Sequence, residues 1–248
     1  TRFVNDNPSS KLVDAMAKTF SKTEGDIRQV MITMVSSPEF WSKAALREKT
    51  KSPFELAISA VRGLDAQITQ PYQLFTWINK MGQKMYYYQA PTGFPDRGQY
   101  WINTGSLLNR MNFGLALASQ RIPGVKINLK ALNANHEPES AEAALLTYSK
   151  MIMPERNLEE TVKRLKPMLN DPELVGKIEK AAEKAPAPQP ETTMMNEDAD
   201  LMTGVKGDGT IKKKRQGKNA AVQTSDGNNT MLAQVVGVII GSPEFQRK

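Results

Sequence analysis

Apolar residues recur at helical spacing along most of this 248-residue chain. One face is marked by an i, i+3, i+4, i+7, i+8 series: Ile27, Val30, Met31, Met34 and Val35. Such spacing predicts amphipathic helices, which we expect over residues 10–20, 27–35, 53–64, 74–81, 104–119, 140–151, 158–169 and 172–183. Outside residues 203–230 no run alternates convincingly between apolar and polar positions, so strands are not expected. The pattern predicts an all-α fold: an irregular multi-helix domain with a single core.

Helix boundaries can be read at several prolines. Ser52-Pro53 is a typical start, in which Ser52 caps the helix and Glu55 closes a capping box. Glu39 and Glu244 also follow prolines at expected helix ends, where a carboxylate can accept hydrogen bonds from free backbone amides. We therefore interpret all three glutamates as caps rather than as catalytic acids.

One phrase occurs twice, near the start of the chain and at its end. Each copy is an apolar stretch that stops at Ser-Pro-Glu-Phe, at Ser37–Phe40 and again at Ser242–Phe245. Proline lacks an amide proton and disfavours a helical conformation in the residue before it, so each copy predicts a buried helix with a defined exit. We expect residues 231–248 to return to the domain, with Phe40 and Phe245 buried in the same core.

A polar stretch separates this last helix from the rest. A proline-rich spacer at 185–190 is followed by acidic residues and then by a segment, 203–230, rich in Gly, Lys, Asn and Ser. The chain is thus divided into a helical domain (1–185), a proline-rich linker with a basic loop or hairpin (186–230), and the returning C-terminal helix (231–248). Most of the net charge of +7 lies in the basic segment. Because neither aromatic residues nor a known module accompany these lysines, nucleic acid is an unlikely partner.

Composition limits the chemistry further. The chain has no cysteine and one histidine, which excludes cysteine nucleophiles, thiolate zinc sites and sites with several histidines from these residues. His136 stands in a polar loop without a second ligand nearby in sequence, so we interpret it as a surface residue. We expect no metal, no cofactor and no catalytic residue. The most apolar run, 231–241, is far shorter than the roughly 20 residues of a membrane-spanning helix.

The least helix-like segment in the middle of the chain is an aromatic loop at 86–101, where prolines and glycines forbid a continuous helix. Asp96 and Arg97 could orient a polar ligand while aromatic rings stack on it, as a sugar-binding surface requires. The candidate ligand-binding residues are Tyr87, Phe94, Asp96, Arg97 and Trp101. The simpler interpretation is that the rings pack the loop onto the helices. On the helix that follows, Asn109, Arg110 and Asn112 are expected to form a buried network that holds the carbonyls of this loop.

Several motifs together resemble a bacterial family, domain of unknown function 1800. They are Phe-Val before an Asn/Asp-Pro stretch (3–8), Gly-Asp-Ile-Arg (25–28), Ser-Pro-Glu-Phe-Trp (37–41), Lys-Thr/Ser-Pro-x-Glu (51–55), Pro-Thr-Gly-Phe (91–94), Trp-x-Asn (101–103), Leu-Leu-Asn-Arg-Met-Asn-Phe (107–113) and a terminal Ser-Pro-Glu-Phe-Gln (242–246). The order and spacing resemble the C-terminal half of the family, over residues 1 to about 120 and the last twenty. Residues 150–230 match no pattern of the family that can be quoted. The resemblance also implies export to the periplasm, the cell surface or the medium, and it places the family's histidine-containing motifs in an N-terminal half outside this chain.

Three functions are compatible with the sequence. The first is a noncatalytic helical module of an extracytoplasmic protein or assembly, whose partner is the N-terminal half of the same precursor or another protein subunit. The second is a fragment of an enzyme whose active site lies in that N-terminal half. The third is a carbohydrate or cell-envelope binding module that uses the aromatic loop. We expect a fragment of this kind to expose an apolar surface complementary to its partner.

Overall fold

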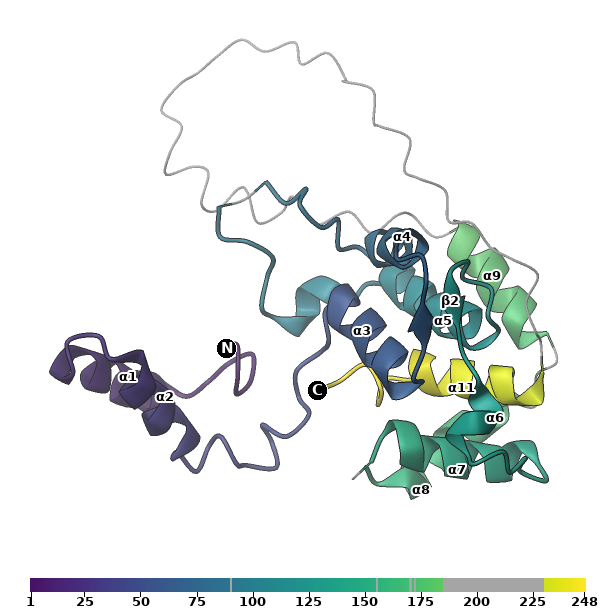
Figure 1. Cartoon of the computed structure of the whole chain (residues 1–248). Helices are drawn as coiled ribbons and strands as arrows, with labels where there is room; N and C mark the ends of the chain where they lie inside the picture. The colour runs from purple at the N-terminus through teal and green to yellow at the C-terminus, as the bar shows by residue number, and fades with distance from the viewer. Residues whose placement is uncertain (90, 155, 170, 172, 185–229) are drawn as a thin grey trace, which may run out of the picture.

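The computed structural model describes residues 1–184 and 230–248, apart from residues 90, 155, 170 and 172 (Figure 1). The linker and basic loop predicted at 186–230 therefore lie outside the described residues, except for Thr230. The chain is mostly helical, which confirms the all-α prediction. The helices are α1 (Ser10–Lys22), α2 (Ile27–Val35), α3 (Pro53–Gly63), α4 (Tyr72–Lys80), η1 (Gly98–Trp101), α5 (Thr104–Ala118), α6 (Leu129–Leu132), α7 (Ala141–Ile152), α8 (Leu158–Leu169), α9 (Leu174–Lys184) and α11 (Met231–Gly241).

A small sheet was not expected. Strands β1 (Gln67–Ile68) and β2 (Val125–Lys126) pair antiparallel, with Gln67 opposite Lys126 and Ile68 opposite Val125. Each strand has two residues, which is too short to produce an alternating pattern in the sequence. This pairing joins the segment after α3 to the segment after α5.

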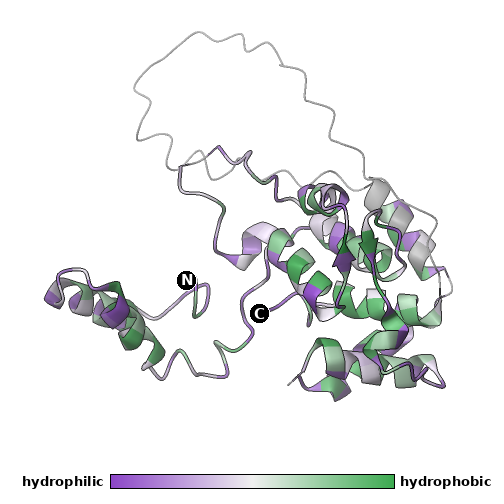
Figure 2. Ribbon diagram, in the orientation of Figure 1, coloured by the Kyte–Doolittle hydropathy of each residue, from purple (hydrophilic) through white to green (hydrophobic). Residues whose placement is uncertain are grey.

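Helix α11 is the centre of the main core. Almost every residue from Leu232 to Gly241 is buried, as expected for a helix that is apolar on all sides. It packs most extensively on α5 and also touches α7 and α8. Figure 2 shows the hydrophobic colouring concentrated on α5 and α11, and Figure 1 shows other helices arranged around them. A segment at the end of the chain thus completes a core built largely from its first two thirds.

Helices α1 and α2 form a hairpin that stands apart from this body (Figure 1). Its own core is small, with Val4, Leu12 and Met34 buried and a few half-buried neighbours around them. Phe40 is one of these half-buried neighbours, whereas Phe245 is 3% exposed in the main core. The expectation that the two phenylalanines share one core is therefore wrong, because the first copy of the repeated phrase belongs to the separate hairpin.

The C-terminal turn is fastened to the segment before α3. Thr50 forms an isolated antiparallel bridge with Arg247, and the amide of Lys51 donates to the carbonyl of Gln246 at 2.8 Å. Lys51 Nζ donates to the Phe245 carbonyl at 2.7 Å and lies 4.0 Å from the centre of the Phe245 ring. These contacts hold the last residues against the segment before α3.

Arg110 lies directly beneath this junction and is fully buried. Its Nη1 donates to the Lys51 carbonyl at 3.0 Å and to Gln246 Oε1 at 3.4 Å. Asn109 Nδ2 donates to the carbonyl of Gly105 in its own helix. The predicted burial is confirmed, but these bonds hold the C-terminal junction and α5 rather than the carbonyls of the aromatic loop. Burial lowers the pKa of Arg110 to about 10, so the guanidinium stays charged at neutral pH.

Candidate functional site

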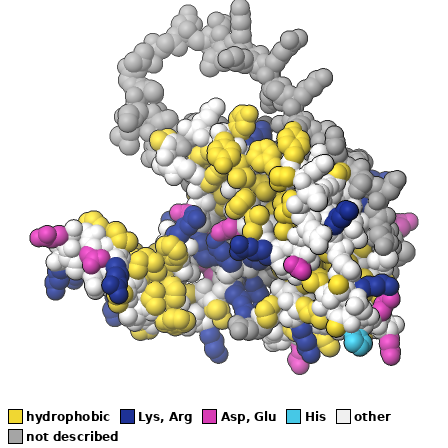
Figure 3. Space-filling model, in the orientation of Figure 1, with side chains coloured by type: hydrophobic (Ala, Val, Ile, Leu, Met, Phe, Trp, Pro, Cys, Tyr) yellow, Lys and Arg dark blue, Asp and Glu magenta, His cyan; other side chains and the backbone are white. Residues whose placement is uncertain are grey.

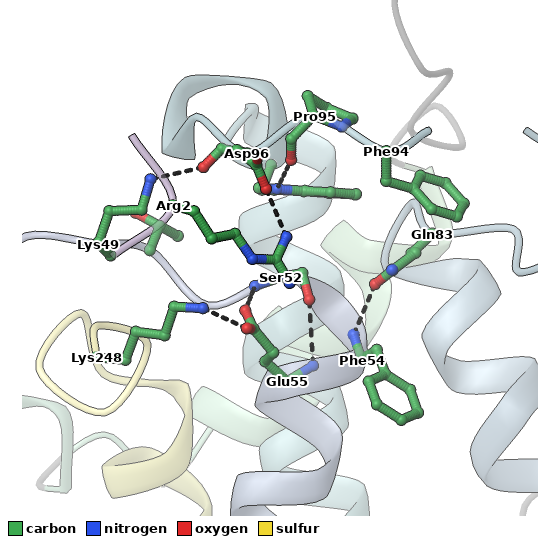
Figure 4. A pocket seen from close by; sticks show the side chains of 12 residues that line it. Arg2, Lys49, Ser52, Phe54, Glu55, Gln83, Phe94, Pro95, Asp96 and Lys248 are labelled. Atoms are coloured by element: carbon green, nitrogen blue, oxygen red, sulfur yellow. Dashed lines mark hydrogen bonds and ion pairs between the residues drawn. The ribbon is translucent and has the colours of Figure 1, made fainter. Parts of the chain in front are cut away.

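A pocket of about 380 Å³ opens where five distant parts of the chain meet (Figure 4). Arg2 comes from the N-terminal segment, Ser52 and Glu55 from the start of α3, Gln83 from the turn after α4, Phe94 and neighbouring residues from the aromatic loop, and Lys248 from the C-terminus. Both chain termini contribute, so only the folded chain can form it. Its lining includes three of the candidate ligand-binding residues from the sequence.

The start of α3 is built as the sequence predicts. Ser52 Oγ accepts a hydrogen bond from the Glu55 amide, and Glu55 Oε2 accepts one from the Ser52 amide at 2.8 Å, which closes the capping box. The remaining oxygen of Glu55 is bonded to Lys248 Nζ. Burial acts to raise the pKa of Glu55, but the hydrogen bonds from Lys248 and Ser52 outweigh it and leave the pKa below its usual value.

The other charged groups are also paired. Arg2 Nη1 lies 2.5 Å from Asp96 Oδ1, and this hydrogen bond raises the pKa of Arg2. Lys49 Nζ contacts Asp6 Oδ1 and donates to the Asp96 carbonyl at 2.6 Å. Asp6 Oδ2 also accepts from the Gly98 amide at 2.7 Å. Burial opposes ionisation of Asp6, yet the bonds from Lys49 and Gly98 hold its pKa below the usual range.

The aromatic rings of the loop stack mainly on one another. Phe94 lies between Tyr88 and Trp101, with ring centres 4.7 and 5.9 Å apart. Trp101 is buried, and its indole Nε1 donates to the Pro95 carbonyl at 3.1 Å. These contacts lie within residues 86–101 and hold the loop together internally. Of the five candidate ligand-binding residues, Phe94, Asp96 and Trp101 line the pocket, whereas Tyr87 and Arg97 are exposed and do not line it.

Most lining residues were not identified as site residues from the sequence, among them Arg2, Lys49, Gln83 and Lys248. These four are up to 246 positions apart in the chain numbering, and no short motif contains more than one of them. Glu55 did carry a signal, the capping box, but that signal points to helix initiation. Only the long-range pairing with Lys248 places it in a pocket.

The ion pairs of the pocket hold the terminal segments in place. The pocket carboxylates of Glu55 and Asp96 are each held in an ion pair, with Lys248 and Arg2 respectively. Within the described part of the chain, no group of three or more His, Asp or Glu residues could hold a metal ion. His136 lies in an exposed loop, away from the pocket-lining residues. Nor is any helix among the described residues long and apolar enough to cross a membrane.

The fold is all-α. In the pocket, each end of the chain is held to the helical body by an ion pair, Arg2 with Asp96 and Lys248 with Glu55. The chain belongs to the family described as protein of unknown function (DUF1800), whose profile matches residues 1–247. The match therefore includes residues 150–230, where no motif of the family could be quoted. No curated protein and no solved structure matches the chain.

Proposed function

We propose that this chain is a noncatalytic helical module of an extracytoplasmic bacterial protein, and that it binds a partner through the α1–α2 hairpin. The observation that carries the proposal is the apolar surface of this hairpin. Trp41 is 72% exposed, Ile27 is 61% exposed, and Val13 and Phe20 are each about half exposed. Single exposed apolar residues are normal, but a gathering of large ones marks an interaction site.

Two of the exposed residues lie on one helix face. Val13 and Phe20 are two helical turns apart and therefore share one face of α1. In Figure 3 hydrophobic side chains gather over the hairpin, and Lys and Arg side chains separate them from a second hydrophobic patch on the helical body. The hairpin thus offers an apolar surface bordered by positive charge.

The hairpin also has little else to stabilise it. Three residues form its buried core, and short helices depend on tertiary packing for most of their stability. Burying the outward face against a second apolar surface would supply such packing. As the occupant we propose the N-terminal half of the same precursor, because the motifs of this chain resemble the C-terminal half of the family.

The test is co-purification. The tagged chain is co-expressed with the N-terminal half of a family precursor, and the affinity of the purified complex is measured. Ile27→Asp is expected to weaken binding about tenfold or more, as for an interface anchor. Gln29→Asp is the matched control, because Gln29 is exposed in the same first turn of α2 and the new charge is identical. Equal affinities for both variants, or no complex with the parent chain, would contradict the proposal.

A carbohydrate ligand of the pocket is a second candidate. It is supported by Phe54, which is 40% exposed on the pocket wall beside Gln83 and Phe94. Binding to isolated cell-wall polysaccharide is expected to fall with Phe54→Ala and to remain with Tyr87→Ala, because Tyr87 lies outside the pocket. If both variants bind like the parent chain, the pocket is not a sugar site.

A further inference from the structure

The aromatic loop carries two tyrosines on its outer side, away from the pocket lining. Tyr86 is 93% exposed and Tyr87 is 77% exposed, the largest exposed fractions among the exposed large hydrophobic side chains of the described residues. In Figure 1 the loop, which joins α4 to η1, extends away from the helical body. Rings so fully hydrated have little contact with the rest of the chain, so packing does not account for their position.

The backbone at the tip of this loop is held in a defined turn. The amide of Tyr87 donates to the carbonyl of Lys84 at 3.1 Å. Tyr86 has a φ of 66°, in the left-handed region, which a bulky side chain rarely adopts. Tyr88 is half-buried and packs on Phe94, with ring centres 4.7 Å apart. The third tyrosine therefore anchors the loop, while the first two are presented to solvent by a strained turn of the kind that is frequent at ligand sites.

The charges around the tip favour an anionic partner. From residue 66 to residue 136, Asp96 is the only Asp or Glu, against seven Lys or Arg residues. Asp96 is paired with Arg2, so this part of the chain offers little repulsion to an anion. Arg97 lies close enough to Asp6 for its charge to act on that carboxylate. Lys84 is exposed in the turn that carries the two tyrosines, and it is the cation on which we base the charge complementarity.

We propose that the tip of the aromatic loop docks on the surface of an anionic lipid membrane. A tyrosine ring is apolar at one end and polar at the other, and tyrosines are enriched where a membrane meets water. Tyr86 and Tyr87 would enter this boundary, and Lys84 would lie among the anionic headgroups. The protein would be attached to the membrane surface through a loop, without crossing the bilayer.

The shape of the tip favours a lipid surface over other anionic partners. A small ligand is usually held in a concave site, whereas these tyrosines lie outside the pocket on a protruding loop. Single-stranded nucleic acid is usually bound in a positively charged groove with stacking aromatic rings, and the tip is not a groove. The proposal is independent of the hairpin partner and of a sugar in the pocket, because neither proposal uses Tyr86, Tyr87 or Lys84 for binding.

The test is co-sedimentation of the full chain with phosphatidylcholine vesicles, with and without phosphatidylglycerol. The parent chain should bind the anionic vesicles more tightly than the neutral ones, and added salt should weaken this binding. Changing Tyr86→Ser and Tyr87→Ser together should weaken it about tenfold or more, because two rings no longer leave water. Lys84→Gln should weaken it about fivefold. Tyr72→Ser is the matched control and should bind like the parent, because Tyr72 is 59% exposed at the other end of α4.

All four substituted side chains are exposed, so the variants should fold like the parent chain, which circular dichroism checks. The proposal is overturned if the parent chain does not bind the anionic vesicles, or if the double tyrosine variant binds them as tightly as the Tyr72→Ser control. Equal binding to neutral and anionic vesicles would also overturn it. A parent chain that binds a single-stranded oligonucleotide but no vesicle would overturn it in favour of nucleic acid.

Discussion

A close contact between α5 and α11 in the core is made through glycines and permits a quantitative test. A Cβ atom placed on Gly114 of α5 would lie 2.7 Å from the carbonyl oxygen of Gly237 in α11. A Cβ on Gly237 would lie 2.9 Å from Cα of Leu115. Real Cβ atoms do not approach backbone atoms so closely, and a backbone cannot move aside as a flexible side chain can. Alanine at either position must therefore push the two central helices apart.

The magnitude follows from two opposing effects. Alanine favours the helix by about 1 kcal/mol relative to glycine. Overpacking a core costs about 1 to 3 kcal/mol. We take about 3 kcal/mol, because the contact is with backbone and because a shift of α11 would disturb every helix that packs on it. Gly237→Ala should therefore lower the free energy of unfolding by about 2 kcal/mol.

The assay is urea unfolding followed by circular dichroism, and the chain supplies its own control. Gly176 lies in α9, and a Cβ there would meet no atom within 4 Å. Gly176→Ala should leave stability unchanged or raise it by up to about 1 kcal/mol. If Gly237→Ala is as stable as Gly176→Ala, then the contact between α5 and α11 is not as close as described.

Three other outcomes are expected. Phe245→Ala should cost about 3 to 5 kcal/mol in urea unfolding, whereas Phe40→Ala, at a half-buried site, should cost clearly less; equal losses would contradict the separation of the two cores. Burial, followed by the charge of Arg156, lowers the pKa of Lys51 to about 8 from 10.5, so the unfolded state binds more protons between these values. Stability should consequently rise with pH from about 8 to 10.5, and a Lys51→Met variant measured over the same range should lose this rise. Replacing residues 186–229 with a short Gly-Ser linker should leave thermal stability nearly unchanged, because loop closure costs only about 0.6 kcal/mol per doubling of length; loss of cooperative unfolding would refute this.

The helices were predictable because their signals are local. Spacing of apolar residues marked α2, and Ser52-Pro53 with Glu55 marked the start of α3, which the structure confirms in atomic detail. The high hydrophobicity of 231–241 likewise indicated burial, and α11 is buried. In each of these cases the information lies within about one helical turn or one helix length.

Contacts between distant segments were not predictable in the same way. The pocket depends on Arg2 meeting Asp96 and on Lys248 meeting Glu55, and neither pair leaves a pattern in a single sequence. The Gly114–Gly237 approach requires that α5 and α11 cross at one point, which helical periodicity does not specify. Side-chain chemistry can be read along the chain, whereas the partner of each side chain is set by topology.

The two copies of the repeated phrase form the same turn but make different contacts with the rest of the chain. In both copies the serine hydroxyl donates to the carbonyl three residues earlier at 2.7 Å, and the phenylalanine amide donates to that hydroxyl at 3.3 Å. The turn itself is thus determined by its four residues. The glutamates differ completely: Glu39 accepts from the amide and hydroxyl of Ser9, while Glu244 pairs with Arg164.

Neither glutamate caps its own helix as expected, since each accepts a hydrogen bond from a neighbouring segment instead. Glu39 fastens the start of α1 and so helps to build the hairpin whose outer face we propose as the partner surface. Glu244 pairs with Arg164 and so fastens the C-terminal turn to α8. The four residues of the phrase therefore determine the turn, whereas the segment that each glutamate reaches is determined by the surrounding fold.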